Sequence, residues 1–325
     1  MTVGFIGLGV MGFGMAVRLA RSGVDVLAFD AVPDRIAALC AEVPARAATS
    51  ISEIGRAADT VVTVLPATRH VEQVYLGESG GDGGLLAALR PGALTIDCSS
   101  ISPASARRIA AAVQQAGGAH LDAGITLSSG PPTRPVTIEP GMSPAVAHAR
   151  AGTLKLLVGG APETLQRAAG VLDVISQEQV YCGPSGAGMT VKLASNMVLA
   201  STTMLLCEVF VWAAKNGVPP NLLLDIFKSG SADSRALRTH VENGALRRRF
   251  GPRPFPVNYM YKDFTEAFEA AAATATPMPI NTVVLDLMQV ARARGFGDQD
   301  YPAVIQVLEL LAGCEPLVIA DEVPT

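Results

Sequence analysis

A glycine-rich turn near the amino terminus constrains this chain more than any other feature. The turn reads Gly7-Leu8-Gly9-Val10-Met11-Gly12, which fits the pattern G-x-G-x-x-G. It directly follows Thr2 to Ile6, a short apolar run typical of a buried strand, and Phe13 to Arg21 then has the composition of a helix. Strand, glycine turn and helix in this order are the context that a dinucleotide-binding fingerprint requires. A glycine-rich turn in some other α/β protein is the alternative interpretation.

Each glycine of the turn has its own physical reason. Gly7 permits the tight turn, Gly9 lets the backbone approach a pyrophosphate, and Gly12 lets the helix pack closely on the strand. A second strand, Val24 to Phe29, ends in Asp30, at about the ~20-residue spacing expected of a carboxylate that binds a ribose 2′-hydroxyl. Because Asp30 would repel a 2′-phosphate and no arginine follows it directly, we expect NAD as cofactor, not NADP.

The composition limits the other classes of function. A chain of 325 residues with 49% hydrophobic residues can fill two cores, and a net charge of −4 without a long basic stretch does not favour nucleic acid. Five widely spaced cysteines without a C-x-x-C pair are typical of free thiols in a reducing cytoplasm. The apolar run Met197 to Ala214 is interrupted by Glu208, so we expect a buried central helix and no membrane partner.

Strand and helix signals alternate as far as Gln179 to Cys182, which indicates a doubly wound parallel sheet. From Gly186 onward only helices are predicted, and the first of them is long and apolar on nearly all sides. We therefore expect a Rossmann-type NAD-binding domain over 1–183 and an all-α domain for substrate binding and oligomerisation over 184–325. Five prolines between Gly124 and Pro144 predict a long irregular loop.

The residues offer one candidate for acid–base chemistry. The four histidines are scattered without the spacing of a metal site, so we expect no metal. A nicotinamide enzyme that oxidises a hydroxyl group needs a group to take its proton. Lys192 lies in an otherwise apolar helix start, and Asn196 shares its helical face. A lysine in an apolar cleft loses its proton more readily, although a lysine snorkelling from a helix end would have the same pattern.

Five motifs together resemble the 3-hydroxyisobutyrate dehydrogenase family, the β-hydroxyacid dehydrogenases related to 6-phosphogluconate dehydrogenase. They extend over nearly the whole chain and comprise the opening signature Gly4 to Ala16, Leu65-Pro66, Asp97-Cys98-Ser99-Ser100, Gly186-Ala187-Gly188 with Lys192 and Asn196, and Lys262-Asp263. The resemblance implies a Rossmann domain followed by an all-α domain, and a homodimer or homotetramer.

The resemblance also implies a role for each motif. Lys192 would be the acid–base group, and Asn196 would help to hold the substrate. Leu65 and Pro66 would lie against the adenosine side of the cofactor, and Ser100, in place of the family's usual threonine, near the nicotinamide. Lys262 and Asp263 would close over the cleft from the helical domain, where both would contact the cofactor and Lys262 also the substrate.

The substrate signature departs from the family pattern. Asp122-Ala123-Gly124-Ile125-Thr126 begins it, but Leu127-Ser128 replaces the paired glycines, and an insertion over 127–145 follows. Either Thr126 or Ser143 could therefore take the role of the substrate-binding serine. The insertion carries Arg134, which together with Arg235 and Lys262 could neutralise a substrate carboxylate. It would either reshape the pocket or form an ordinary surface excursion.

These features favour a cytoplasmic NAD-dependent oxidoreductase that interconverts a small 3-hydroxy acid and its semialdehyde or keto acid. An imine reductase with the same architecture is one alternative, and the presence of Lys192 argues against it. A non-catalytic NAD-binding protein is another, and it would need neither Lys192 nor Asn196.

Overall fold

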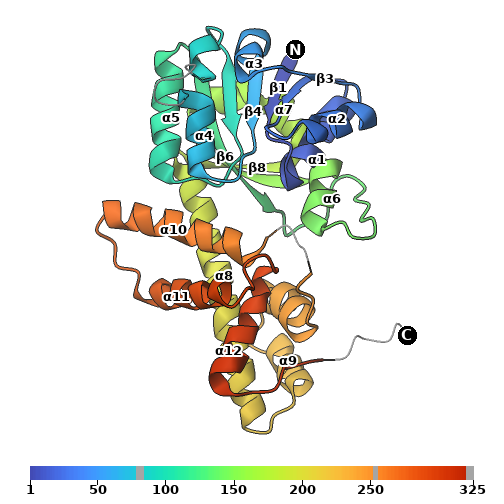
Figure 1. Ribbon diagram of the computed structural model, residues 1–325, viewed down its shortest axis with the longest axis vertical. Helices are drawn as coiled ribbons and strands as arrows, with labels where there is room; N and C mark the ends of the chain where they lie inside the picture. The colour runs from blue at the N-terminus through green and yellow to red at the C-terminus, as the bar shows by residue number, and fades with distance from the viewer. Residues whose placement is uncertain (78–83, 252–254, 320–325) are drawn as a thin grey trace. The chain divides into compact units, whose positions relative to one another are not determined.

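The computed structural model describes residues 1–77, 84–251 and 255–319 (Figure 1). The chain forms two compact units, Met1–Leu193 and Ala194–Thr325. The division falls inside helix α8 (Ala187–Lys215), later than the predicted boundary at 183/184, because the first turns of this helix pack on the sheet of the first unit. The functional domain ranges 1–183 and 184–325 stay a prediction.

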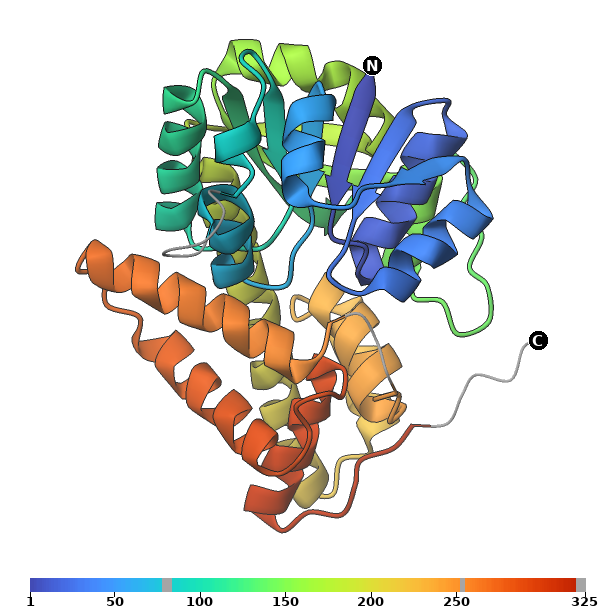
Figure 2. The ribbon, with the colours of Figure 1, turned by 45° about the horizontal axis from the view of Figure 1, so that its top comes forward.

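The first unit contains one eight-stranded sheet with the order β3-β2-β1-β4-β5-β6-β7-β8, whose strands lie side by side in Figure 2. The strands are β1 (Thr2–Ile6), β2 (Asp25–Phe29), β3 (Ala45–Ala47), β4 (Thr60–Thr63), β5 (Leu94–Asp97), β6 (Ala119–Leu127), β7 (Leu154–Gly160) and β8 (Ser176–Gly183). From β1 the strand order runs through β2 and β3 on one side and through β4 and β5 on the other, so its direction changes between β1 and β4. Doubly wound sheets bind ligands at such a switch point, outside the carboxyl ends of the strands.

One pairing differs from the parallel arrangement that the sequence predicted for the sheet as a whole. Strand β7 is antiparallel to β6, with Leu127 opposite Leu154, whereas the other neighbouring strands are parallel. The reason is that β6 continues beyond its pairing with β5, which ends at Asp122, so the chain re-enters the sheet from the far end of β6.

Helices cover both faces of this sheet. They are α1 (Val10–Arg21), α2 (Pro33–Glu42), α3 (Ile51–Ala57), α4 (Thr68–Leu76), the short η1 (Leu86–Ala88), α5 (Pro103–Gln115), α6 (Pro144–Ala151) and α7 (Pro162–Ile175). Residues of α1, α2, α6 and α7 share a core with one face, and residues of α3, α4, α5 and the start of α8 share a core with the other. Helix α6 begins at Pro144, where the predicted proline-rich loop ends, because proline is well tolerated at the first position of a helix.

The second unit is all-helical over its described residues, as predicted. It contains most of α8, then α9 (Pro220–Ser229), the wide-turned π-helix η2 (Leu237–Leu246), α10 (Val257–Ala273), α11 (Pro279–Ala293), the short η3 (Tyr301–Val304) and α12 (Ile305–Ala312). Phe210 of α8, Phe264 of α10 and Tyr301 of η3 are fully buried in its core. Among the described residues, α8 alone is long and apolar enough to span a membrane by length and composition, a test that core helices of soluble proteins also pass.

Candidate active site

The glycine turn fits a bound dinucleotide at the carboxyl end of β1. Gly7 has a φ of +99°, and a Cβ there would lie 2.3 Å from the carbonyl oxygen of Val64. A Cβ on Gly12 would lie 2.0 Å from the Gly7 oxygen, whereas a Cβ on Gly9 would meet open space. Helix α1 begins directly after Gly9, and no side chain caps it there. Its first N–H groups can therefore donate to the phosphates of NAD, and the open space beside Gly9 leaves room for those phosphates.

Asp30 closes this turn from the end of β2. Its Oδ2 atom accepts from the Leu8 N–H at 2.6 Å, and its Oδ1 atom accepts from the Val32 N–H at 2.8 Å. The Arg35 guanidinium forms an ion pair with the same carboxylate at 3.4 Å, and its side chain is half exposed. Asp30 thus places its carboxyl group where the fingerprint expects the ribose, and it also holds the turn in shape.

A second loop at the same edge is held by a residue that sequence reasoning missed. The Ser99 hydroxyl donates to Oδ1 of Asp97 at 2.6 Å and accepts from the Leu65 N–H at 2.8 Å. Thr63 also donates to that carboxylate oxygen, at 2.6 Å. Ser99 therefore connects β5 to the loop of Leu65 and Pro66. The signal was the spacing Asp-x-Ser, in which a hydroxyl can fold back on a nearby carboxylate; the predicted Ser100 is its neighbour.

Asp97 itself is fully buried. Burial raises the pKa of the Asp97 carboxyl to about 6, and the neighbouring Asp122 carboxylate acts in the same direction. Hydrogen bonds from Ser99 and Thr63 oppose this shift because they stabilise the charged form. The second oxygen of Asp97, Oδ2, has no hydrogen-bond partner.

Lys192 lies over the extended end of β6. A Cβ on Gly124 would be 2.8 Å from the Lys192 Cβ, so the helix and the strand are in direct contact at this point. Side chains alternate along a strand, which puts Thr126 on the same face of β6 as Gly124 and therefore on the Lys192 face.

Ser143 has a different environment. Its hydroxyl accepts from the Val146 N–H at 3.3 Å and caps helix α6, which packs on α1 against the other face of the sheet. The structure thus brings Thr126, and not Ser143, to the face that carries Lys192.

In the second unit, Asp263 connects two predicted site residues. Its Oδ2 atom accepts from the Asn196 amide at 2.6 Å, and its Oδ1 atom pairs with the Lys262 ammonium at 2.9 Å. Asp263 is only 2% exposed. Both carboxylate oxygens of Asp263 therefore bind side chains of this unit and orient Asn196 and Lys262. This arrangement fits the predicted direct contact of Asp263 with the cofactor less well.

The proline-rich insertion is fastened to the edge of the first unit. Arg134 donates to the backbone oxygens of Gly152 and Asp173, and the Thr133 N–H donates to Gln177 at 2.8 Å. Ser128 donates to Glu178 at 2.9 Å. The predicted role of Arg134 as a partner for a substrate carboxylate is therefore corrected, because its guanidinium binds main-chain carbonyls beside α7 and β8. Arg235 lies in the second unit, just before η2.

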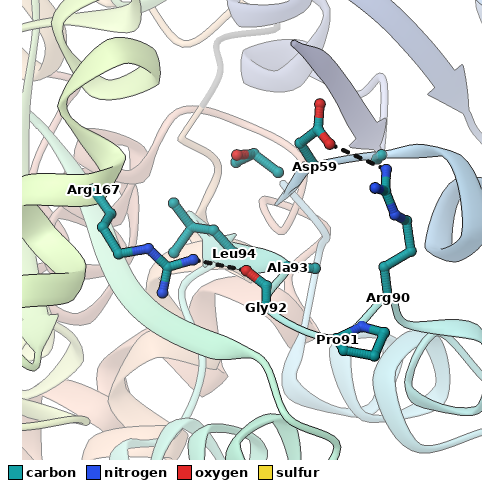
Figure 3. Close-up of a pocket in the computed structure, with 9 residues that line it drawn as sticks. Asp59, Arg90, Pro91, Gly92, Ala93, Leu94 and Arg167 are labelled. Carbon is teal, nitrogen blue, oxygen red and sulfur yellow. Dashed lines mark hydrogen bonds and ion pairs between the residues drawn. The ribbon is translucent and has the colours of Figure 1, made fainter.

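A hollow of about 250 Å³ lies at the opposite, amino edge of the sheet (Figure 3). Its two arginines are already paired, since Arg90 binds Asp59 at 3.1 Å and Arg167 donates to the Gly92 oxygen at 2.7 Å. This hollow is separate from the carboxyl ends of the strands. Within the described residues, no group of three histidine, cysteine or acidic side chains could hold a metal ion.

Comparison with known proteins identifies the class. Residues 2–131 match the NAD-binding domain of 6-phosphogluconate dehydrogenase, and residues 186–308 match the NAD-binding domain of NADP-dependent 3-hydroxyisobutyrate dehydrogenase. The fold and these matches define an NAD-dependent oxidoreductase that acts on CH–OH groups. Within that class, the chain belongs to the 3-hydroxyisobutyrate dehydrogenase family of hydroxyacid dehydrogenases.

Two relatives illustrate the likeness. An NAD-dependent L-serine dehydrogenase of Pseudomonas aeruginosa is 33% identical over 317 residues, which cover 96% of this chain and 99% of that protein. The solved structure of Mycobacterium tuberculosis 3-hydroxyisobutyrate dehydrogenase with L-serine is 30% identical, with a TM-score of 0.80 over 94% of this chain and 98% of that one. An imine reductase from Pseudomonas sp. is more distant, with 18% identity and a TM-score of 0.53 over 94% and 99%, and shares the fold alone.

Proposed function

We propose that this protein oxidises a small 3-hydroxy acid to its semialdehyde or keto acid, or runs the reverse reduction, with Lys192 as the general acid–base group. The observation that most supports this proposal is the position of Lys192, which packs on β6 at Gly124, on the face of the sheet that also carries Thr126. NAD, when bound, supplies the hydride acceptor.

Each residue has a defined part in this proposal. In oxidation, the neutral Lys192 amine takes the hydroxyl proton as the hydride leaves the carbon, and in reduction the ammonium returns it. Asn196, oriented by Asp263, holds the substrate hydroxyl or carboxylate with its amide. Thr126 and Lys262 supply hydrogen bonds and positive charge for the substrate carboxylate, which needs both when it leaves water.

The substrate class is a short acid with a hydroxyl group at the 3-position. Two relatives carry L-serine in their names, and L-serine is such an acid. A panel of L-serine, 3-hydroxyisobutyrate, 3-hydroxypropionate and a 2-hydroxy acid, assayed by NADH formation, tests the proposal. We expect turnover with at least one 3-hydroxy acid and none with the 2-hydroxy acid. Turnover of cyclic imines with no 3-hydroxy acid oxidised would favour the imine reductase alternative instead.

We further propose a homodimer or homotetramer in the cytoplasm. In the second unit, Val198, Leu205 and Trp212 recur every seven residues on one exposed face of α8, with 68%, 60% and 66% of each residue accessible. A row of exposed apolar side chains along one helix face is typical of a protein–protein contact. The five cysteines are all free thiols in the structure, which fits a reducing compartment.

A further inference from the structure

The start of helix α8 is held by a buried carboxylate that none of the roles above uses. Asp122 of β6 is fully buried, and its Oδ1 atom accepts from the Gly186 N–H at 2.7 Å. Its Oδ2 atom accepts from the Met189 N–H at 3.0 Å. Because the first N–H groups of a helix have no partner within it, one carboxylate here satisfies donors that would otherwise be left unpaired.

Glycines from two elements permit this contact. A Cβ on Gly159 of β7 would lie 2.6 Å from an Asp122 oxygen, and a Cβ on Gly188 of α8 would lie 2.8 Å from one. The same Gly188 Cβ would lie 2.4 Å from the Leu157 oxygen. Only with glycine at these positions can the helix come down onto the sheet far enough for its N–H groups to reach the carboxylate.

Lys192 is one helical turn beyond this anchor and touches the same strand. Its Cβ and the site of a Gly124 Cβ are 2.8 Å apart, two residues along β6 from Asp122. The height and rotation of Lys192 over the strand are thus set by two contacts, the Asp122 carboxylate at the helix start and the bare backbone of Gly124 beneath it.

We infer that Asp122 is a positioning residue for the reaction, which fixes α8 so that the Lys192 amine stands at the reacting hydroxyl. This inference rests on the proposed function of Lys192. Asp122 touches neither substrate nor cofactor in this account. A misplacement of about 1 Å in a reacting group can cost on the order of 100-fold in rate.

Four variants of the full chain test the inference, assayed with the best 3-hydroxy acid of the panel. Asp122→Asn replaces one acceptor oxygen by an amide, and Gly124→Ala raises the helix at its second contact. Gly118→Ala is the matched control, because its Cβ would lie 2.9 Å from Val113, a similar clash before β6 and far from α8 along the strand. Lys192→Ala reports on the proposed function itself. The readouts are kcat, KM, the calorimetric Kd for NAD and the melting temperature.

We expect Asp122→Asn and Gly124→Ala to lower kcat on the order of 10–100-fold while the Kd for NAD stays unchanged, and Gly118→Ala to keep its kcat. A folded Asp122→Asn with wild-type kcat would overturn the inference, provided that Lys192→Ala is inactive. If Asp122→Asn does not fold, Gly124→Ala decides, and a wild-type kcat there overturns it as well. An active Lys192→Ala would instead remove the proposed function, and the inference with it.

Discussion

The Asp30 carboxylate contacts both the glycine turn and the Arg35 guanidinium, so one residue joins the shape of the cofactor site to its charge. Its predicted role came from its spacing after the glycines. Its hydrogen bond with the Leu8 N–H could not be predicted in this way, because spacing gives no information about which backbone groups a buried carboxylate will reach.

Asp30→Asn tests this double role. The amide oxygen can still accept from the Leu8 N–H, but the carboxylate that would repel a 2′-phosphate is gone. Arg35 loses its ion pair with residue 30 and becomes available to bind a 2′-phosphate. Since a hydrogen bond to a charged group contributes about 1.5–3 kcal/mol, we expect the preference for NAD over NADP in kcat/KM to fall on the order of 10–100-fold. In the double variant with Arg35→Ala, the gain with NADP should disappear. An unchanged preference in the single variant would refute the assignment.

Asp97 gives a prediction about stability and pH. Its pKa is about 6 in the folded protein and near the ordinary value of 3.8 in the unfolded chain. The folded state therefore holds the proton more tightly, and its stabilising contribution is complete below about pH 4 and lost as the pH rises through about 6. The difference of about two pKa units corresponds to about 3 kcal/mol.

The comparison with Asp97→Asn isolates this contribution, because Asn is neutral throughout. Urea unfolding across the pH range should show the free energy of unfolding of the wild type, relative to the variant, falling by about 3 kcal/mol between about pH 4 and 7. A difference that stays constant with pH would mean that Asp97 does not titrate in this range.

At the scale of elements, the predictions held where periodicity or composition is local and failed where pairing is long-range. Ser50 caps α3, and an apolar repeat runs through α5, and both are signals that a short stretch of sequence carries by itself. The antiparallel β7 was missed because the register of β6 and β7 depends on residues about thirty positions apart. The Asp122 anchor was missed for the same reason, since only the fold brings β6 to the start of α8.

The proline-rich insertion also became interpretable only through long-range contacts. Because Arg134 and Thr133 fasten it beside α7 and β8, we expect it to contribute to stability and not to specificity. Arg134→Ala should lower the free energy of unfolding by about 0.5–1.5 kcal/mol, since the carbonyl oxygens of Gly152 and Asp173 lose their donor at a partly exposed site. The ranking of the substrate panel should stay the same when 129–141 is replaced by a short glycine turn. A changed ranking in a folded variant would show that the insertion shapes the pocket.

At the scale of the whole molecule, the apolar face of α8 in the second unit gives the prediction for assembly. Leu205 and Trp212 are more than half exposed, and a charge on both would make a protein–protein contact there unfavourable. Leu205→Glu with Trp212→Glu should reduce the mass measured by light scattering to that of one chain. The matched control is Leu222→Glu with Ile226→Glu, which charges an exposed apolar face of α9. If the α8 variant keeps the wild-type mass, the contact lies elsewhere.

If Lys192 exchanges the proton of the substrate hydroxyl, replacing it must slow the reaction, and steady-state NADH formation by Lys192→Ala and Lys192→Arg measures this loss. Arginine keeps the positive charge but does not give up its proton, so it separates acid–base chemistry from simple attraction. We predict that both variants lose on the order of 10²–10⁴ in kcat while the calorimetric Kd for NAD and the melting temperature stay near those of the wild type. Near-full kcat in either variant would contradict the account.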